Sequence, residues 1–258
     1  MTQQPPQGEV DRVVGADRVL AVLVELARHP NGATLEDLAA TLGSPKSTVH
    51  RALVSLRKSS LAQQTARGVY ALGDEFIRLA FQNYESRPDT ARLEPLLREL
   101  SSDYGETVHY AVLDGKDVVY RAKVDPPQGA VKLTSTIGGR NPAYRTAVGK
   151  VLLSHLLSTR EQLDAWLGDD ELPSKTEFTI TDRAALLAEL IATRERGYGI
   201  DDQENEIGIN CVAVPVYALD PDRPVGAISV SALKFRHPIE ELLQTVPALV
   251  AKVQRVDN

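Results

Sequence analysis

The sequence predicts an α+β protein with two domains. Length and composition allow this, because 258 residues with 43% hydrophobic and 25% charged side chains can fill two ordinary cores. Helical periodicity prevails up to about residue 90. Beyond it, alternating segments typical of antiparallel strands are interspersed with amphipathic helices, which favours an α+β fold for the second part.

The segment Ser44–Lys58 is predicted to be a helix with one cationic face. Ser44 can act as N-cap, and Pro45 suits the first helical position, which needs no N–H. Apolar residues recur at helical spacing: Val49, Ala52, Leu53 and Leu56. The opposite face is basic and rich in hydroxyls, without any carboxylate: Ser47, Arg51, Val54 and Lys58, flanked by His50 and Ser55.

A shorter helix is predicted just before it. Thr34 to Asp37 has the form of a capping box, and Gly43 suits the end of the helix that follows. A short helix, a glycine turn and a second helix form a helix–turn–helix arrangement. Taken alone, the pattern fits either DNA recognition or a surface helix pair in any helical domain.

The flanking chain favours DNA recognition. Residues 44–70 hold five Lys/Arg and no Asp/Glu, although the net charge of the chain is −6. A basic patch on an otherwise acidic protein indicates a nucleic-acid surface confined to one region. Leu61–Leu72 predicts a β-hairpin with Gly68 at its turn, which would be the wing of a winged helix–turn–helix. Arg67, near the tip, either contacts DNA or is a solvated turn residue.

Two further helices are predicted around this motif. Asp17–Ala27 forms the first, with Asp17 as its cap. Gly73–Ser86 forms the other, and its apolar face is too broad for a solvent-exposed linker. Arg87 to Asp89, with a central proline, marks a domain boundary.

The segment Gly43–Arg51 closely resembles the recognition-helix signature of the isocitrate-lyase-regulator (IclR) family of bacterial transcription factors, and the similarity runs from about Arg18 to about Val253. The resemblance implies an effector-responsive regulator of a metabolic operon. Its partners would be double-stranded operator DNA of palindromic sequence, a small-molecule effector and further copies of itself, as a dimer or a dimer of dimers. The residues expected at the DNA are Lys46, Ser47, Thr48, His50, Arg51, Lys58 and Arg67.

The same resemblance assigns the domains. We expect a disordered N-terminus over residues 1–14, a winged helix–turn–helix domain over 15–73, a linker helix that pairs subunits over 74–90, and a GAF-like α+β effector-binding domain over 91–258. Family members often carry glycine where this chain has Ser60, so the turn into the wing is expected to differ.

In the second domain the periodicity predicts antiparallel strands with helices to one side. The expected strands are Thr107–Leu113, Asp117–Val124, Ala130–Ser135, Cys211–Ala218 and Val225–Leu233. The expected helices are Leu93–Tyr104, Thr146–Leu157, Arg160–Leu167, Asp182–Arg196 and a closing helix Pro238–Val253.

Three segments resemble the family signatures around one effector pocket: residues 138–150, 197–211 and 228–231. The resemblance places eight residues there: Leu133, Ala147, Val148, Asp201, Ile209, Cys211, Ser229 and Ser231. Ser229 and Ser231 would point to one face of a strand, where they either bind the effector or form structural hydrogen bonds. Cys211 is either a contact or a small buried hydrophobe.

The start of the helix at Thr146 predicts the chemistry of the effector. Free N–H groups at a helix N-terminus suit an anion, so we expect a small carboxylate, aliphatic or aromatic. Asp201, as an anion, would face a hydroxyl or amine of that ligand. Tyr144 and Arg145 depart from the family pattern and lie either over the pocket mouth or on the surface.

Enzyme motifs are missing, so we expect no catalysis, no cofactor and no metal. The chain has no Walker A loop, no G-x-G-x-x-G, no G-x-S-x-G and no H-E-x-x-H. The alternative is a GAF-like ligand-binding module or an enzyme without a DNA role, in which Cys211 and His109 would be a nucleophile pair. No apolar run approaches the roughly 20 residues of a membrane span. We therefore expect a cytoplasmic protein without a membrane partner.

Overall fold

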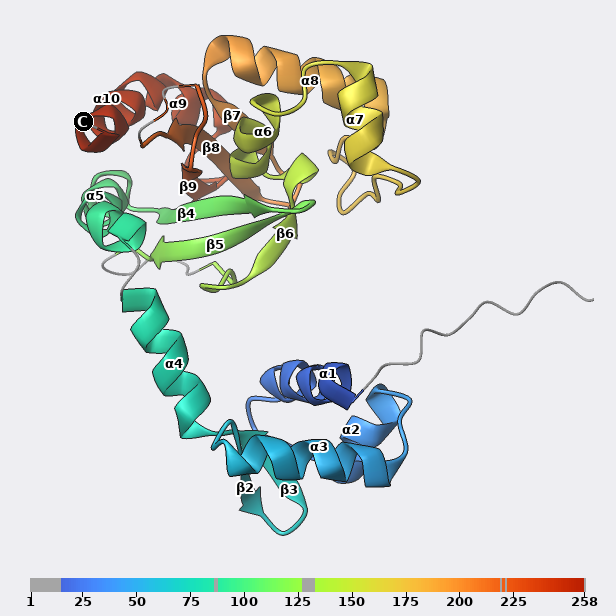
Figure 1. The fold of residues 1–258 in the computed structure, drawn as a ribbon. Coiled ribbons are helices and arrows are strands. Elements are labelled where there is room, and N and C mark those ends of the chain that lie inside the picture. Colours follow the sequence, from blue (N-terminus) through green and yellow to red (C-terminus); the bar gives the residue numbers. More distant parts are fainter. Residues whose placement is uncertain (1–14, 86–87, 127–132, 219, 221, 258) are drawn as a thin grey trace, which may run out of the picture. The chain divides into compact units, whose positions relative to one another are not determined.

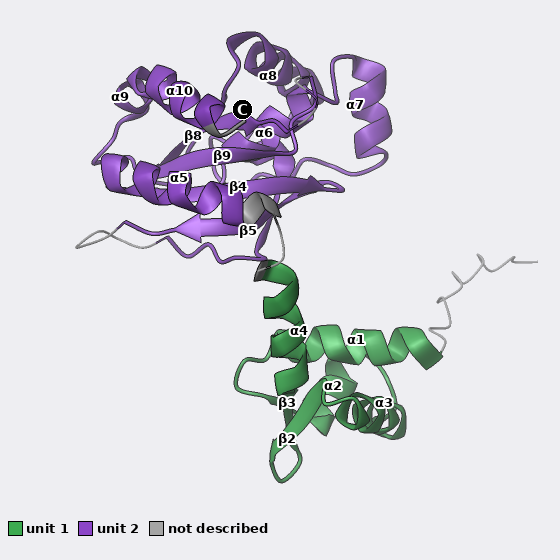
Figure 2. Ribbon diagram, turned by 60° about the vertical axis from the view of Figure 1, so that its left-hand side comes forward, with its two compact units in different colours: residues 1–87 green, residues 88–258 purple. Residues whose placement is uncertain are grey.

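The computed structural model describes residues 15–85, 88–126, 133–218, 220 and 222–257. The chain divides after Arg87 into two compact units, which Figure 2 shows in different colours. The expected disordered N-terminus, residues 1–14, lies outside the described residues. No described helix is both long and apolar enough to cross a membrane.

The first unit is a small helical domain with a three-stranded sheet (Figure 1). Its elements are α1 Gly15–Ala27, β1 Ala33–Thr34, α2 Leu35–Thr41, α3 Lys46–Lys58, β2 Ala62–Ala66, β3 Val69–Leu72 and α4 Asp74–Glu85. The sheet order is β1-β3-β2, and both pairings are antiparallel. Strands β2 and β3 form the predicted hairpin, whereas β1 is too short to show an alternating pattern in the sequence.

The core of this unit explains the apolar stripe of α3. Val49, Ala52, Leu53 and Leu56 are all buried, together with side chains of α1, α2 and Tyr70. Burial of this stripe fixes which face of α3 remains outside. The orientation of α3 is therefore set by the packing of this stripe.

The caps of the first unit follow the sequence with two exceptions. The capping box of α2 is present, since Asp37 N donates to Thr34 Oγ1 at 3.1 Å and Thr34 N donates to Asp37 Oδ2 at 3.1 Å. Ser44 does not cap α3, because Pro45 occupies the cap position and the Ser44 hydroxyl donates to Leu42 O instead. Asp17 lies inside the first turn of α1, which begins at Gly15.

The second unit is built on a six-stranded antiparallel sheet of order β6-β5-β4-β9-β8-β7. The strands are β4 Thr107–Asp114, β5 Asp117–Val124, β6 Arg140–Pro142, β7 Gly199–Asp202, β8 Ile209–Val216 and β9 Gly226–Leu233. The helices are α5 Pro88–Tyr104, α6 Ala147–Ser154, α7 Arg160–Leu167, α8 Arg183–Arg196, α9 Ile239–Gln244 and α10 Val246–Asp257, with a short 3₁₀ turn at Ala143–Arg145.

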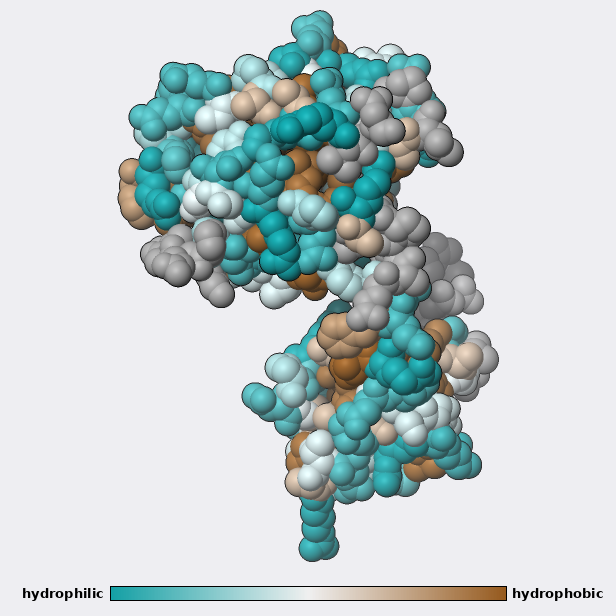
Figure 3. Space-filling view, turned by 90° about the vertical axis from the view of Figure 1, so that its left-hand side faces the viewer, coloured by the Kyte–Doolittle hydropathy of each residue, from teal (hydrophilic) through white to brown (hydrophobic). Residues whose placement is uncertain are grey.

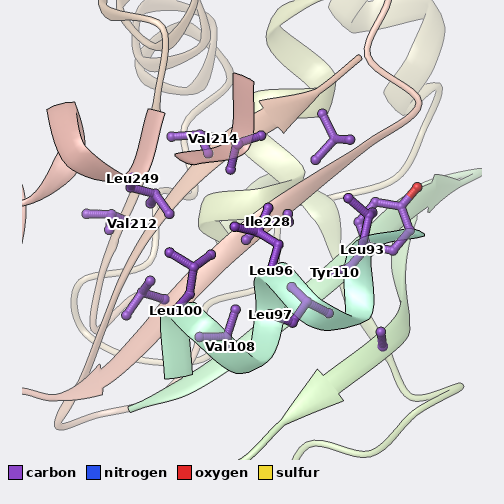
Figure 4. Close-up of a cluster of buried hydrophobic side chains, with 14 of the residues drawn as sticks. Leu93, Leu96, Leu97, Leu100, Val108, Tyr110, Val212, Val214, Ile228 and Leu249 are labelled. Atoms are coloured by element: carbon purple, nitrogen blue, oxygen red, sulfur yellow. The ribbon is translucent and has the colours of Figure 1, made fainter. Parts of the chain in front are cut away.

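Helices cover both faces of this sheet, so the expectation of helices to one side was wrong. Figure 4 shows the core between the sheet and α5 and α10, where Leu97, Val108 and Ile228 interdigitate. The other face packs on α6 through residues such as Ala111, Val151 and Ala213. Because side chains alternate along a strand, odd-numbered positions of β4 and β9 face α6.

Two other predicted elements differ. Of the strand expected at Ala130–Ser135, residues 130–132 lie outside the described part, and 133–135 are not a strand; the edge strand is β6 instead. The closing helix breaks at Thr245 into α9 and α10. Pro247 explains the break, because its ring would clash with the carbonyl four residues earlier in a continuous helix.

Candidate DNA-reading face and effector cavity

The outer face of α3 is exposed and almost free of internal partners. Lys46, Ser47, His50, Arg51 and Lys58 are exposed, and no carboxylate among the described residues pairs with Arg51 or Lys58. A protruding helix with such a face has the geometry that enters a DNA major groove. The packing of α3 therefore exposes, on one helix, most of the residues that were predicted to contact DNA.

The remaining DNA candidates differ in their surroundings. Thr48 is only half-exposed. Lys46 Nζ donates to Glu36 Oε1 at 2.9 Å, but both side chains are largely exposed, and such a surface pair is worth at most about 1 kcal/mol. DNA phosphate can therefore replace Glu36. Arg67 is exposed at the turn between β2 and β3.

The second unit contains a cavity of about 350 Å³ on the α6 face of the sheet. All eight residues that the sequence placed at an effector pocket border it, and they come from four separate regions of the chain. The cavity also has lining residues that were not predicted for an effector pocket, among them Tyr120, Ser135, Asn205 and His109, which was named only with Cys211 in the enzyme alternative. Its size suits a small organic ligand.

His109 could not be found from local sequence. It sits opposite Ser229 in the β4–β9 ladder, so it faces the cavity only because these two strands pair in this register. Its partner Ser135 lies in an irregular segment without a periodic pattern. The sequence predicts how side chains alternate along β4, but it does not predict which strand pairs with β4.

The N-terminus of α6 forms one wall of the cavity. Thr146 caps the helix by accepting from Gly149 N at 3.0 Å. A side chain at Gly149 is excluded, because a Cβ there would lie 2.1 Å from Ala143 O. Ala147 and Val148, the first two helical residues, border the cavity. Their backbone N–H groups are not needed for helix bonds and suit an anion.

Asp201 is tied into the protein rather than being a free anion. Its Oδ1 accepts from Glu204 N at 2.8 Å and from Asn205 N at 3.2 Å, which closes the turn between β7 and β8. Burial, with the nearby Glu204 carboxylate second, raises the pKa of Asp201 to about 7. Asp201 was expected to be an anion, whereas with this raised pKa it is partly protonated near neutral pH.

Cys211 and His109 do not form a nucleophile pair. Ser231 lies between them, since Cys211 Sγ donates to Ser231 Oγ at 3.2 Å and Ser231 Oγ is 3.3 Å from His109 Nδ1. Burial raises the pKa of the Cys211 thiol well above its usual value and lowers the pKa of His109 to about 3. Both groups are therefore neutral, so neither a thiolate nor an imidazolium is present.

Tyr144 and Arg145, which were expected to depart from the family pattern, have different positions. Tyr144 is buried, and its hydroxyl donates to Pro173 O, so it lies neither over the mouth nor on the surface. Arg145 is half-buried and borders the cavity. Its Nε donates to Asn205 Oδ1 at 3.0 Å, while no carboxylate of the described residues forms an ion pair with its guanidinium.

An exposed helix–turn–helix with a wing, joined to a domain with a ligand-sized cavity, defines a ligand-responsive DNA-binding protein. Models of the IclR helix-turn-helix domain and of the bacterial transcriptional regulator IclR C-terminal domain match residues 15–66 and 85–258. The chain belongs to the IclR family of bacterial transcriptional regulators, and it is a DNA-binding regulator, not an enzyme.

The similarity to known relatives extends over most of the chain and most of each relative. The chain is 33% identical over 231 residues to the HTH-type transcriptional regulator XynR of Escherichia coli, covering 89% of this chain and 90% of that one. It is 33% identical over 234 residues to the acetate operon repressor of Salmonella typhimurium, covering 89% and 82%. The fold is similar to that of the Thermotoga maritima IclR, with a TM-score of 0.73 at 26% identity, over 94% of this chain and 96% of that one. It is also similar to that of an IclR homologue from Microbacterium hydrocarbonoxydans in complex with 4-hydroxybenzoate, with a TM-score of 0.77 at 20% identity, over 93% of this chain and 98% of that one.

Proposed function

We propose that this regulator represses a metabolic operon by binding a palindromic operator as a dimer, and that a small carboxylate in the cavity controls the binding. The observation that carries the proposal is the exposed face of α3, which is basic, free of carboxylates and part of the unit that does not hold the cavity. Binding to operator DNA also makes the cytoplasm its place of action.

The proposed DNA contacts divide by chemistry. Arg51 offers a planar guanidinium that can pair with the O6 and N7 atoms of guanine, whereas Lys46 and Lys58 suit phosphates. Ser47, Thr48 and His50 lie on or beside the same face of α3, and Arg67 lies on the wing. Arg51 would then read one base pair, and the surrounding contacts would fix the position of the protein along the DNA.

The proposed effector is a carboxylate because the cavity offers donors for an anion. Besides the N–H groups of Ala147 and Val148, the Arg145 guanidinium has donors beyond the single one used by Asn205. A half-buried guanidinium without an internal carboxylate favours an anionic ligand, because burial of an unpaired charge is costly. Leu133, Ile209 and the remaining expected residues would contact the rest of the ligand.

The experiment combines DNA and effector binding. Fluorescence anisotropy with the upstream region of the neighbouring gene should show tight, salt-dependent binding. Thermal shift with 4-hydroxybenzoate, pyruvate and 4-hydroxybenzamide should show stabilisation by an acid but not by the amide. An acid that stabilises the protein should also change its affinity for DNA. Absence of DNA binding in the first assay would overturn the proposed regulatory role. Absence of stabilisation by either acid would overturn the proposal that the effector is a carboxylate.

The proposed dimer is formed through α4. Ile77, Leu79 and Phe81 of this helix are exposed, at 44%, 46% and 61%, and Figure 3 shows hydrophobic surface on the first unit. Such a run of exposed apolar side chains on a 12-residue helix suits contact with a second copy. Phe81→Asp should therefore yield monomers in sedimentation and lose operator binding. A wild-type protein that is monomeric at micromolar concentration would contradict this arrangement.

A further inference from the structure

A line of four hydrogen-bonding side chains crosses the cavity wall. It runs from Cys211 on β8 to Ser231 on β9, to His109 on β4, and to Ser135 in the segment that follows β5. The last contact is the shortest, with His109 Nε2 2.8 Å from Ser135 Oγ. His109 and Ser231 are more than nine-tenths buried, Cys211 is partly buried, and all four side chains border the cavity.

The order of protons along this line can be derived from the groups themselves. The Cys211 thiol keeps its proton and donates it to Ser231 Oγ. His109 is a neutral imidazole, because burial and the nearby Lys123 ammonium lower its pKa to about 3, so one ring nitrogen donates and the other accepts. With the thiol proton directed at Ser231 Oγ, two arrangements remain, one for each tautomer.

The two arrangements differ in which hydroxyl proton is left over. If Nε2 carries the proton, Ser231 donates to Nδ1, Nε2–H donates to Ser135 Oγ, and the free proton belongs to Ser135. If Nδ1 carries it, Ser135 donates to Nε2, and the free proton belongs to Ser231. Ser231 is only 4% exposed, whereas Ser135 is half-exposed. The first arrangement leaves no buried donor without an acceptor, which is the rule for protein interiors.

We infer that His109 holds the Nε2–H tautomer and thereby turns Ser135 into the hydroxyl that donates to the effector. The inference rests on the proposed effector site. Lys123 holds the segment that carries Ser135 against β5, because its Nζ donates to Leu133 O and Ser135 O, both at 2.8 Å. The effector therefore presents an acceptor, such as a keto or carboxylate oxygen, to Ser135. Toward Ser231, whose proton is already committed, it presents an apolar group or a donor.

The tautomer can be measured without any ligand. In the full-length protein labelled with ¹⁵N-histidine, the His109 ring, assigned by its loss in His109→Gln, should show Nδ1 as the unprotonated and Nε2 as the protonated nitrogen at pH 7. Ser231→Ala removes the donor to Nδ1, so the two tautomers should then become mixed. A wild-type ring protonated on Nδ1, or on both nitrogens, would overturn the inference, because Ser231 would then hold the free proton.

The donor role of Ser135 is tested by calorimetric titration with 4-hydroxybenzoate and pyruvate. Ser135→Ala should weaken binding of the acid that binds wild type by about 3- to 10-fold, as expected for loss of one neutral hydrogen bond. Ser158→Ala is the control, since this exposed hydroxyl does not border the cavity and donates to Gln162 Oε1 at 3.1 Å, and it should change affinity less than twofold.

The two experiments separate the two proposals. Equal affinities of wild type and Ser135→Ala would overturn the donor role while leaving the effector site standing. If neither acid binds wild type, the proposed carboxylate site fails and the donor role fails with it. The tautomer is decided by the spectrum in either case.

Discussion

The face of α3 and the cavity of the second unit differ in how far their polar groups are already satisfied. Arg51 and Lys58 are exposed and have no ion-pair partner among the described residues, so their full charge is available to DNA. In the cavity, Asp201, Cys211 and Ser231 each have an internal hydrogen bond. A change on α3 should therefore alter binding alone, whereas a change near the cavity should alter stability as well.

The largest expected effect is at Lys150 of α6, which is 1% exposed. Its Nζ donates to Ile200 O at 2.7 Å and pairs with Glu204, so Lys150→Met leaves a buried carboxylate without a counter-charge. We expect the free energy of unfolding of the second unit to fall by about 3–5 kcal/mol. Urea unfolding followed by the single tryptophan, Trp166 on α7, measures this.

Arg98→Met is the matched control for Lys150. Arg98 pairs with Glu94 one turn away on α5, and both side chains are more than half exposed, so its loss should cost less than about 1 kcal/mol. A Lys150→Met variant as stable as Arg98→Met would mean that the buried cluster contributes nothing to the second unit.

The next effect is a pH dependence at Asp201. The pKa of this carboxyl is raised from 3.8 to about 7, so between these values the folded protein binds more protons than the unfolded chain. Stability is therefore lost as the pH rises through this window. Asp201→Asn keeps an oxygen acceptor for Glu204 N and Asn205 N but does not titrate. Its stability relative to wild type should grow by roughly 2–4 kcal/mol from pH 4 to pH 7.

The comparison with wild type also removes an opposing effect. The pKa of His109 is lowered to about 3, so its contribution to stability is lost as the pH falls below 6.5. This contribution is common to both proteins and cancels in the difference. A difference in unfolding free energy between the two proteins that stays constant from pH 4 to pH 7 would show that the pKa of Asp201 is not raised.

On α3 the expected effects are smaller and confined to DNA. Arg51→Ala should reduce discrimination at one base position by about 1–3 kcal/mol. Lys58→Ala should weaken all sequences alike and reduce the salt slope by about one. Anisotropy titrations against operator and scrambled DNA at several salt concentrations distinguish the two patterns. Unchanged binding by both variants would mean that α3 is not the helix that meets DNA.

The difference between the sites also explains how much of each was predictable. The residues of α3 lie within one helix, so helical spacing alone separated its buried stripe from its exposed face. The cavity is assembled from four regions of the chain, and only the family resemblance brought its eight residues together. His109 and Ser135 were not predicted as effector-pocket residues, because their position depends on the β4–β9 register and on an irregular segment.

The fold itself shows the same limit. The hairpin of the wing, the capping box of α2 and most helices followed from local patterns. The edge strand β6, the break at Thr245 and the helices on both faces of the sheet did not, because each is decided by long-range packing or pairing rather than by periodicity.

The smallest expected effect is at Ser60, the position where the family resemblance leads us to expect glycine. Ser60 follows α3 with φ +56°, and Leu61 N donates to Leu56 O at 2.9 Å, which is the geometry of a left-handed helix terminus that favours glycine. Ser60→Gly should therefore raise the free energy of unfolding of this unit by about 0.5–1 kcal/mol, the relief of strain exceeding the gain in freedom of the unfolded chain. Ser59, at φ −95°, is the control, and Ser59→Gly should only destabilise. Denaturant unfolding monitored by circular dichroism decides the sign, and a destabilised Ser60→Gly would show that serine is held there by a contact of its own.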